Sequence, residues 1–261
     1  MLGVKTAVIS DIHGNAVALR AVLSDIDGQG VDRIVCLGDI IGYGPEPLEC
    51  VDLVRERCAW ALMGNHDFGV LYEPTNFNAD AENAAYWTRE QFDAEPDDAL
   101  RAARYEFLGR LRVRIVEKLG SGHELLAVHG SPRRPINEYI FPDDVMDNPE
   151  KVGNIFERVT KLCMVGHTHV PGIFTDEPDF YPPAELGADL RYTFIEAEKA
   201  VINVGSVGQP RDLDPRASYA LLDDAGVSFR RVEYDIAATA DKIKAVPQLQ
   251  DRLAERLFDG R

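Results

Sequence analysis

The histidines are concentrated where they could do chemistry. Five of the six lie in short polar turns, and each of these turns follows a run of apolar residues. The same turns carry carboxylates and one amide, in the order Asp11-Ile12-His13, Gly38-Asp39, Gly64-Asn65-His66-Asp67, His129-Gly130 and Gly166-His167-Thr168-His169. Imidazole, carboxylate and amide groups form a nitrogen and oxygen donor set that suits Mn, Fe or Zn ions. The pattern therefore predicts a metal site without thiolate ligands.

The spacing of these residues indicates more than one ion. Asp11 and His13 are separated by one residue, so in an extended backbone both point to the same side and can bind one ion. His167 and His169 lie in a turn and could instead reach two different ions. Seven candidate ligands exceed what one ion with open water positions needs, and Asp39, the only candidate in its turn, could bridge a pair.

The apolar runs before the turns predict the elements that must position these residues. Short apolar runs without alternation are typical of strands that are covered on both faces, as in α/β folds. Helical periodicity at residues 15–28 and 47–57 predicts helices between the first strands. In an open α/β sheet the C-terminal ends of the strands converge on one edge, where ligand crevices form. Residues that are distant in the sequence can therefore meet there.

The remaining sequence predicts one domain with additions. Residues 78–116 are rich in alanine, arginine and glutamate and predict two helices inserted between core strands. Proline and acidic residues after Gly172 predict an exposed hairpin or loop with weak strand character. An Ala-Gly turn between two later apolar runs predicts a β-hairpin, and one terminal helix is expected over residues 237–257. We expect residues 1–261 to form a single domain.

Composition excludes several kinds of partner. The chain has 28 basic and 44 acidic side chains, and its formal net charge of −16 would repel duplex nucleic acid from any surface without a strong local positive feature. No segment approaches the roughly 20 apolar residues of a membrane span, and the first residues lack the pattern of a secretory leader. The four cysteines form no CxxC pair and predict reduced structural thiols. We therefore expect a cytoplasmic protein that does not bind membranes.

The ordered motifs DxH, GD, GNH, H and GHxH resemble those of the calcineurin-like metallophosphoesterases over the range from Asp11 to His169. The resemblance implies an α/β fold, a four-layer α/β/β/α sandwich of two mixed sheets, here with a helical insertion. It also implies two divalent metal ions per chain, with manganese preferred and iron, zinc, nickel or cobalt as alternatives. The residues carried over as ligands are Asp11, His13, Asp39 and His169 for one ion, and Asn65, His129, His167 and the shared Asp39 for the second.

The same resemblance implies hydrolysis of a small phosphodiester or phosphomonoester by attack of a metal-bridging hydroxide, with nucleotide-derived esters among the candidates. His66 would be the non-ligand histidine that protonates the leaving group, next to Asn65 at the substrate. Asp67 stands where many relatives have glutamate and would orient the His66 imidazole. Arg211 could contact the phosphate, or it could belong to a surface ion-pair network with Asp212, Asp214 and Arg216.

Three further segments, GYGPEPLECVDLVRE, AAYWTREQF and NVGSVGQPRD, resemble a bacterial branch of small phosphodiesterases of the YfcE type. The same metal core would also serve a phosphoprotein phosphatase or a dinucleoside polyphosphate hydrolase. The alternative of a different class is a non-catalytic scaffold on this fold, although scaffolds of that kind have lost the catalytic histidine, and His66 is present. The inserted helices could form a lid or a dimer contact, so a homo-oligomer is left open.

Overall fold

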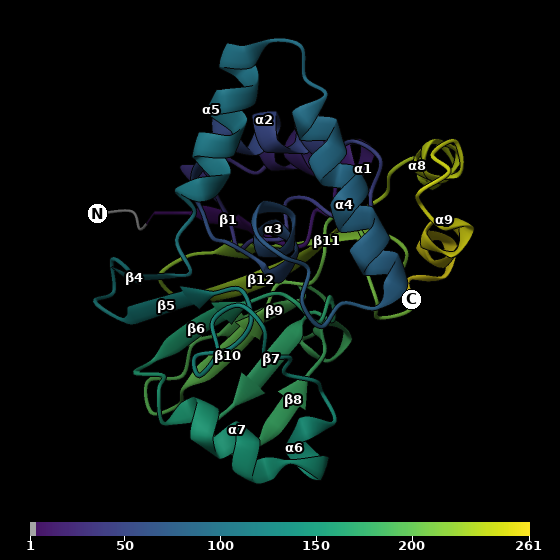
Figure 1. Cartoon of the computed structure of the whole chain (residues 1–261). Helices are drawn as coiled ribbons and strands as arrows, with labels where there is room; N and C mark the ends of the chain where they lie inside the picture. Colours follow the sequence, from purple (N-terminus) through teal and green to yellow (C-terminus); the bar gives the residue numbers. More distant parts are fainter. Residues whose placement is uncertain (1–3) are drawn as a thin grey trace.

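In the computed structural model, which describes residues 4–261, two β-sheets stack on each other and helices cover their outer faces (Figure 1). Residues 1–3, which the predicted domain included, lie outside the described part of the chain. Each sheet has six strands and contains both parallel and antiparallel pairs. The predicted α/β sandwich of two mixed sheets is therefore confirmed.

The first sheet is built around three parallel strands from the first part of the chain. Its spatial order is β3 (Cys58–Ala61), β2 (Arg33–Cys36), β1 (Thr6–Ile9), β11 (Ala217–Leu222), β12 (Gly226–Val232) and β9 (Arg191–Thr193). β1, β2 and β3 run parallel, whereas β11 is antiparallel to β1. β11 and β12 form the β-hairpin that the sequence predicted.

The second sheet has a matching parallel core. Its spatial order is β4 (Arg114–Lys118), β5 (Glu124–Val128), β6 (Leu162–Val165), β10 (Ala200–Asn203), β7 (Gly172–Thr175) and β8 (Asp179–Tyr181). β5, β6 and β10 run parallel to one another. The segment that was predicted as one hairpin or loop divides between the sheets, because β8 pairs with β7 while β9 pairs with β12.

Apolar side chains fill three layers between the four structural layers. α1 (Ala16–Asp27) and α2 (Pro47–Arg57) cover the first sheet, and α6 (Asp144–Asp147) and α7 (Pro149–Phe156) cover the second (Figure 1). Successive strand residues face opposite sides of a sheet. Ala7 and Ile9 of β1 therefore pack toward the helices, whereas Val8 packs between the two sheets. Both faces of the central strands are buried, which explains their unbroken apolar runs.

The insertion consists of two helices that follow α3 (Asn65–Leu71). They are α4 (Ala79–Asp93) and α5 (Asp98–Gly109). The predicted boundary at residue 116 was wrong, because residues from Arg114 onward pair with β5 as strand β4. The buried guanidinium of Arg104 joins α5 to the rest of the protein, with Nη2 2.6 Å from the Asp52 carboxylate on α2 and Nη1 2.5 Å from that of Glu95.

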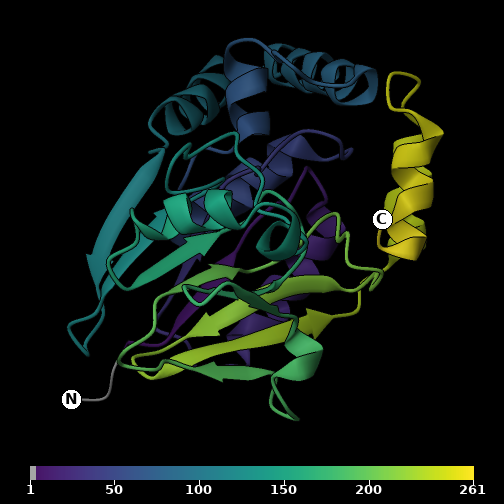
Figure 2. The ribbon, with the colours of Figure 1, turned by 90° about the horizontal axis from the view of Figure 1, so that it is seen from below.

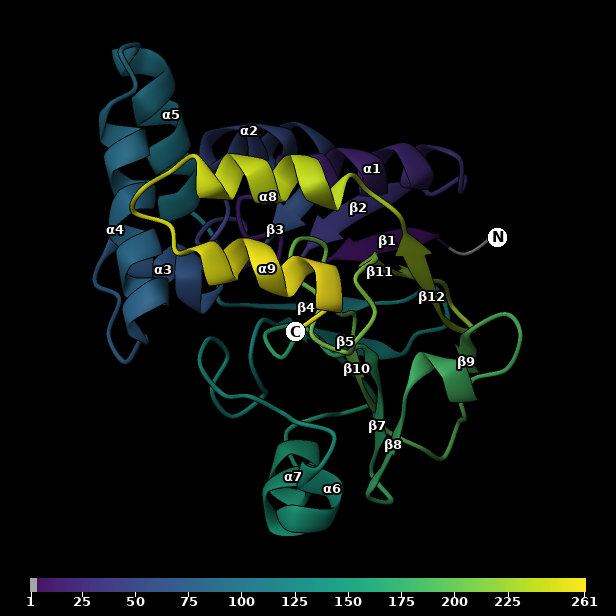
Figure 3. The ribbon, with the colours of Figure 1, turned by 90° about the vertical axis from the view of Figure 1, so that its right-hand side faces the viewer.

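The terminal helix predicted over residues 237–257 is also corrected. The chain forms α8 (Ile236–Lys244) and α9 (Asp251–Asp259), and the break contains Pro247, which lacks the N–H that a continuous helix needs. Figures 2 and 3 show α8 and α9 lying side by side along one flank of the molecule. Their apolar faces pack against α4 and against Tyr43, which follows the Gly38-Asp39 turn.

The cysteines and the lengths of the helices can also be compared with the sequence-based predictions. Cys36, Cys50, Cys58 and Cys163 are all free thiols, and three of them are buried in apolar surroundings, as the sequence predicted. None of the helices in residues 4–261 combines the length and the apolar character that crossing a lipid bilayer requires.

Arg104→Ala is expected to lower the free energy of unfolding by about 2 kcal/mol, because the carboxylates of Asp52 and Glu95 lose the cation that pairs with both. The loss is smaller than for a fully buried ion pair, since Asp52 is partly exposed and water can solvate its carboxylate. The matched control is Arg110→Ala on the same helix, whose solvated pair with Glu106 should contribute about 0.5 kcal/mol or less. Urea unfolding followed by circular dichroism measures both values. Equal losses in the two variants would contradict a special role of Arg104 in anchoring the insertion.

Candidate metal centre

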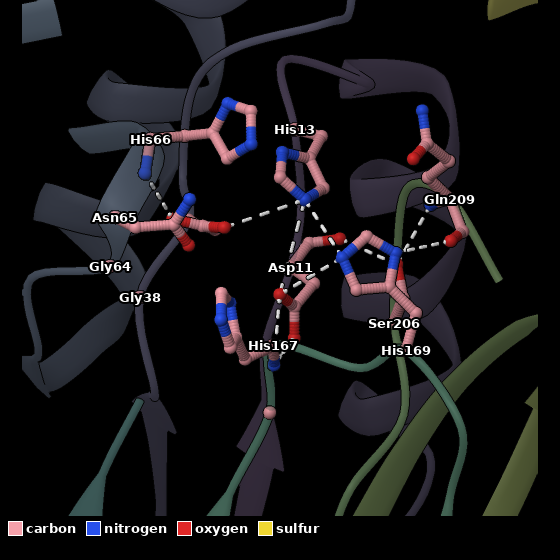
Figure 4. A network of polar contacts seen from close by, with 12 residues as sticks. Asp11, His13, Gly38, Gly64, Asn65, His66, His167, His169, Ser206 and Gln209 are labelled. Atoms are coloured by element: carbon pink, nitrogen blue, oxygen red, sulfur yellow. Dashed lines mark hydrogen bonds and ion pairs between the residues drawn. The ribbon is translucent and has the colours of Figure 1, made fainter. Parts of the chain in front are cut away.

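The parallel strands of both sheets end at one common edge, and each is followed by a turn that carries chemistry. β1, β2 and β3 lead into the turns of His13, Asp39 and Asn65. β5 and β6 lead into the turns of His129 and His167. Figure 4 shows how the side chains of Asp11, His13 and His169, which come from two distant segments, point toward one another. All seven predicted ligands are thus brought together, and the topology of the two sheets explains why.

The first group of converging atoms comes from Asp11, His13 and His169. The Nε2 atoms of the two histidines lie 3.0 Å apart, and His169 Nε2 is 3.2 Å from a carboxylate oxygen of Asp11 (Figure 4). All three side chains are buried. Three buried donor atoms that face one point form a site that a metal ion fits.

The second group comes from Asp39, His129 and His167, with Asn65 beside it. His129 Nε2 lies 3.3 Å from a carboxylate oxygen of Asp39 and 3.2 Å from the side-chain oxygen of Asn65. His167 Nε2 is buried and has no hydrogen-bond partner among the described residues. A buried nitrogen without a partner is costly, so its lone pair marks a place for a ligand.

Asp39 lies between the two groups. The carboxylate oxygen that approaches His129 is also 3.6 Å from Nε2 of His13, which belongs to the first group. Its other oxygen accepts the backbone N–H of His66 at 2.8 Å, which orients the carboxylate. The buried histidine and aspartate clusters are therefore consistent with a dinuclear metal site in which one carboxylate is shared.

In two of the imidazoles, the ring nitrogen that points away from the cluster makes a hydrogen bond that determines which nitrogen carries the proton. Nδ1 of His129 is 3.0 Å from the carbonyl oxygen of Leu37, and Nδ1 of His169 is 2.6 Å from that of Gln209. A carbonyl only accepts, so both Nδ1 atoms carry a proton, and each Nε2 atom faces the cluster, where its lone pair can bind a metal ion once the ring is neutral. Protein metal sites commonly orient their histidines in this way.

Burial and mutual charge shift the acid–base equilibria of the cluster. Burial opposes ionisation of Asp39, but the neighbouring histidines His129, His66 and His13 together hold the carboxyl pKa well below its usual range. Burial also disfavours a charged His129, yet the Asp39 carboxylate raises its pKa to about 9. Burial lowers the pKa of His167 to about 3 and that of His66 to about 4. Neutral imidazoles and ionised carboxylates are the forms that bind metals, so a metal ion at His129 must displace the proton that the Asp39 carboxylate favours there.

The ligand turns adopt an uncommon backbone conformation. Positive φ angles, which cost energy for residues other than glycine, occur at Asp11 (53°), His13 (49°), Asp39 (51°), His167 (68°) and His169 (62°). Glycines next to the carboxylates allow close approach: a Cβ on Gly64 would overlap Asp39, and one on Gly166 would overlap Asp11. The glycines of the motifs therefore serve the carboxylates directly.

The C-terminal end of β10 and the segment that follows it support these turns, and the sequence motifs alone did not assign them this role. The amide of Asn203 donates to the Gly166 carbonyl and to the Thr168 hydroxyl, both at 2.7 Å. The hydroxyl of Ser206 donates to the carbonyl of Asp11 at 2.7 Å. The NVGSVGQPRD segment thus holds the first and last ligand turns together, and its polar residues at a strand end were the available signal.

His66 borders the cluster, enclosed by aromatic rings. Its ring centroid is 4.3 Å from that of Tyr43 and 4.6 Å from that of Phe77, and its Nδ1 has no hydrogen-bond partner among the described residues. The prediction that Asp67 orients this imidazole is wrong. The Asp67 carboxylate accepts backbone N–H groups from Ile40, Ile41 and Gly64, at 2.9, 3.3 and 2.9 Å. It therefore ties the Asp39 turn to the Asn65 turn.

Arg211 lies beside Gln209 and Tyr43 and does not join the surface network. Its guanidinium donates to the side-chain oxygen of Gln209 at 2.6 Å and lies 6.0 Å from the centre of the Tyr43 ring. The network itself exists without it: Arg216 and Arg231 pair with Asp212 and Asp214. Of the two readings left open by the sequence, the structure favours a position beside the site. His123, outside every motif, lies near Glu196 and away from the cluster.

Comparison with known proteins gives a consistent result. A family model described as the calcineurin-like phosphoesterase superfamily domain matches residues 4–225. An uncharacterized protein of Methanocaldococcus jannaschii is 40% identical over 260 residues, which cover 98% of each chain. The crystal structure of a metallophosphoesterase from Sphaerobacter thermophilus is 38% identical with a TM-score of 0.80, and the match covers 99% of this chain and 100% of that one. The E. coli phosphoesterase YfcE is distant, at 18% identity and a TM-score of 0.45.

Asp67→Asn is expected to lower the free energy of unfolding by about 2 kcal/mol, because an amide cannot accept all three N–H bonds and leaves buried donors unpaired. Since the link positions Asp39 and Asn65, manganese affinity should also fall about tenfold. Urea unfolding and titration calorimetry measure the two effects. Asp259→Asn, an exposed control, should change neither, and unchanged manganese affinity in Asp67→Asn would mean that the link does not position the ligands.

Proposed function

The chain belongs to the calcineurin-like phosphoesterase superfamily, and from that premise we propose that it hydrolyses phosphate esters with two divalent metal ions. The observation that carries the proposal is the position of Asp39 between two buried groups of metal-binding side chains. Two-metal hydrolases use such a pair of ions to act on both sides of the phosphoryl group. The fold alone would not support this proposal, because one fold can serve many functions.

Each ion would be held by residues of both sheets. The proposed ligands are Asp11, His13, Asp39 and His169 for one ion, and Asp39, Asn65, His129 and His167 for the other. When bound, two divalent ions would supply a hydroxide nucleophile near neutral pH and positive charge for the phosphoryl oxygens. We propose manganese, although iron, zinc, nickel or cobalt would suit the same donors.

The charge balance supports a phosphate ester as the substrate. The chain carries a net charge of −16, so its surface repels anions in general. At the centre, however, two divalent ions bring more positive charge than Asp11 and Asp39 remove. Arg211 adds a fixed cation at the side of the cluster. A small phosphate ester would therefore be attracted to this one point of an acidic protein.

His66 is the proposed proton donor to the leaving group. Its imidazole lies at the edge of the cluster, and the rings of Tyr43 and Phe77 restrict its orientation. An imidazole within hydrogen-bond reach of a departing alkoxide can stabilise it, by proton transfer when the ring is protonated and by donating an N–H hydrogen bond when the ring is neutral. Asn65, next in the chain, lies close enough to the second ion group to contact the phosphate as well.

Several substrates would suit the proposed two-metal centre. A diester preference of the YfcE type, a dinucleoside polyphosphate hydrolase and a phosphoprotein phosphatase would all use this centre. A non-catalytic scaffold would have no need of His66 and seven ligands brought together at one sheet edge. The complete set of residues therefore favours a hydrolase over a scaffold.

Protein loaded with manganese is expected to bind about two ions per chain and to release nitrophenol from bis-p-nitrophenyl phosphate or p-nitrophenyl phosphate. Asp39→Asn should retain less than two ions and lose about 100-fold or more in kcat, because an amide cannot hold both ions by charge. Metal analysis and nitrophenol release measure both. Two ions without turnover of either ester would favour the scaffold, and normal loading and rate in Asp39→Asn would refute the shared carboxylate.

Arg211→Ala is expected to raise KM about tenfold with unchanged metal content, because the guanidinium would form a charge-assisted hydrogen bond to the phosphate. Arg216→Ala is the matched control, since Arg216 pairs with Asp214 in the surface network. Steady-state kinetics with the preferred nitrophenyl ester compare the two. If both variants keep the wild-type KM, Arg211 does not contact the substrate.

A further inference from the structure

A cavity of about 600 Å³ adjoins the metal centre. Asn65 and His167, both from the second ligand group, form part of its lining. One wall comes from α3 and the segment that follows it, through Phe68, Asn76 and Phe77, and the other comes from the loop after His129, through Arg134, Asn137 and Tyr139. The volume is within the range of pockets for small organic ligands, about 300–1,000 Å³. A phosphate bound at the centre would have its organic group within reach of this space.

The lining combines exposed aromatic rings with two amides and one guanidinium, and it also holds one carboxylate, that of Glu73, which accepts the Tyr86 hydroxyl at 3.3 Å. The side chains of Phe68 and Tyr139 are 39% and 40% exposed, although large aromatic side chains are usually buried. The amides of Asn76 and Asn137 form no hydrogen bond within residues 4–261. The guanidinium of Arg134 forms no ion pair with any described residue, although acidic side chains exceed basic ones in this chain. Rings, amides and one cation are therefore free to meet a ligand.

The first wall of the cavity is held from outside by the insertion. The guanidinium of Arg89 on α4 donates to the backbone carbonyls of Gly69, Val70 and Tyr72, at 3.1, 2.7 and 2.8 Å. These carbonyls belong to the end of α3, where intrahelical partners run out. The bonds hold the α3 end from which Phe68 reaches the cavity.

The second wall is held by an ion pair within its own loop. The guanidinium of Arg133 and the hydroxyl of Ser131 both donate to the Glu138 carboxylate. Arg133 is thereby engaged, whereas its neighbour Arg134 points into the cavity lining without a partner. Tyr139 is in turn stacked on the His167 imidazole, with ring centroids 3.7 Å apart. Both walls are therefore organised before a ligand binds, which reduces the entropy cost of binding.

We infer that this cavity binds the nucleoside part of a nucleotide ester, an inference that rests on the proposed function of the adjoining centre. A base can stack on an exposed aromatic ring such as Phe68, and side-chain amides can pair with its polar edge. Arg134 provides a cation for a second phosphate or phosphonate group. A lipid chain fits less well, because it would cover the amides and the guanidinium without pairing them.

The test compares two ligands that differ only in the nucleoside. Manganese-loaded protein is titrated in a calorimeter with α,β-methylene-ADP and, separately, with methylenediphosphonate. We expect the nucleotide analogue to bind at least about tenfold more tightly, the effect of one stacked base. Phe68→Ala should remove this difference, and Phe68→Tyr, which keeps the ring, should retain it. Equal affinity of the wild-type protein for both ligands would overturn the inference.

Arg134→Ala should weaken binding of the nucleotide analogue about tenfold. Lys118→Ala should leave it unchanged, since Lys118 lies opposite Glu124 in the β4–β5 strand pair, at the end of β5 that is distant from His129. An unchanged affinity in both Phe68→Ala and Arg134→Ala would also overturn the inference. The titration does not require turnover. A protein that hydrolyses nitrophenyl esters without preferring the nucleotide analogue would refute the cavity assignment alone, and one that binds the analogue without hydrolysing any ester would refute only the proposed hydrolase.

Discussion

Two carboxylates with almost no contact with solvent are the constraint on which the centre depends. Asp11 and Asp39 are 0% and 1% exposed, and an isolated charge in such an environment costs several kcal/mol unless it is compensated. Histidines from both sheets surround them, and backbone N–H groups of His66 and His167 donate to them. The two sheets must therefore be stacked with their parallel strands ending at one edge, because no single sheet supplies enough partners.

The need to surround two buried carboxylates with partners also explains the strained backbone of the ligand turns. Residues with positive φ persist only where the surroundings determine their conformation, and here hydrogen bonds from distant segments do so. Asn203 and Ser206 hold the turns of His167 and Asp11, while Asp67 joins two neighbouring turns of the first sheet. These bonds keep the donor atoms in one place before any ion binds, which is how a site gains affinity without new contacts.

An α/β fold and the meeting of these polar turns at one sheet edge could be predicted from local patterns of apolar runs and turns, whereas the four-layer arrangement was implied by the family resemblance. Apolar runs that end in His13, Asp39 or His129 indicate strand ends regardless of how the sheets pair. The role of Asp67 could not be predicted in this way, since it depends on the distance between two turns that only the folded chain defines. The cavity is similar: Phe68 and Arg134 belong to no motif and meet only through tertiary structure. The break between α8 and α9, in contrast, follows from a local feature of the sequence, because Pro247 cannot donate the N–H of a continuous helix.

The separation between the cavity walls and the ligand turns has an evolutionary consequence. The turns that carry the proposed ligands leave the ends of the central strands, whereas much of the cavity wall is formed by Phe68, residues 73–77 and residues 134–139. Surface loops of this kind generally tolerate changes in length and composition better than core strands do. A lineage could exchange either wall and acquire a new substrate while inheriting the reaction unchanged. One metal centre could in this way act on different substrates in different homologues. Differences in substrate specificity among homologous enzymes are therefore expected to correlate with the sequences of these two loops.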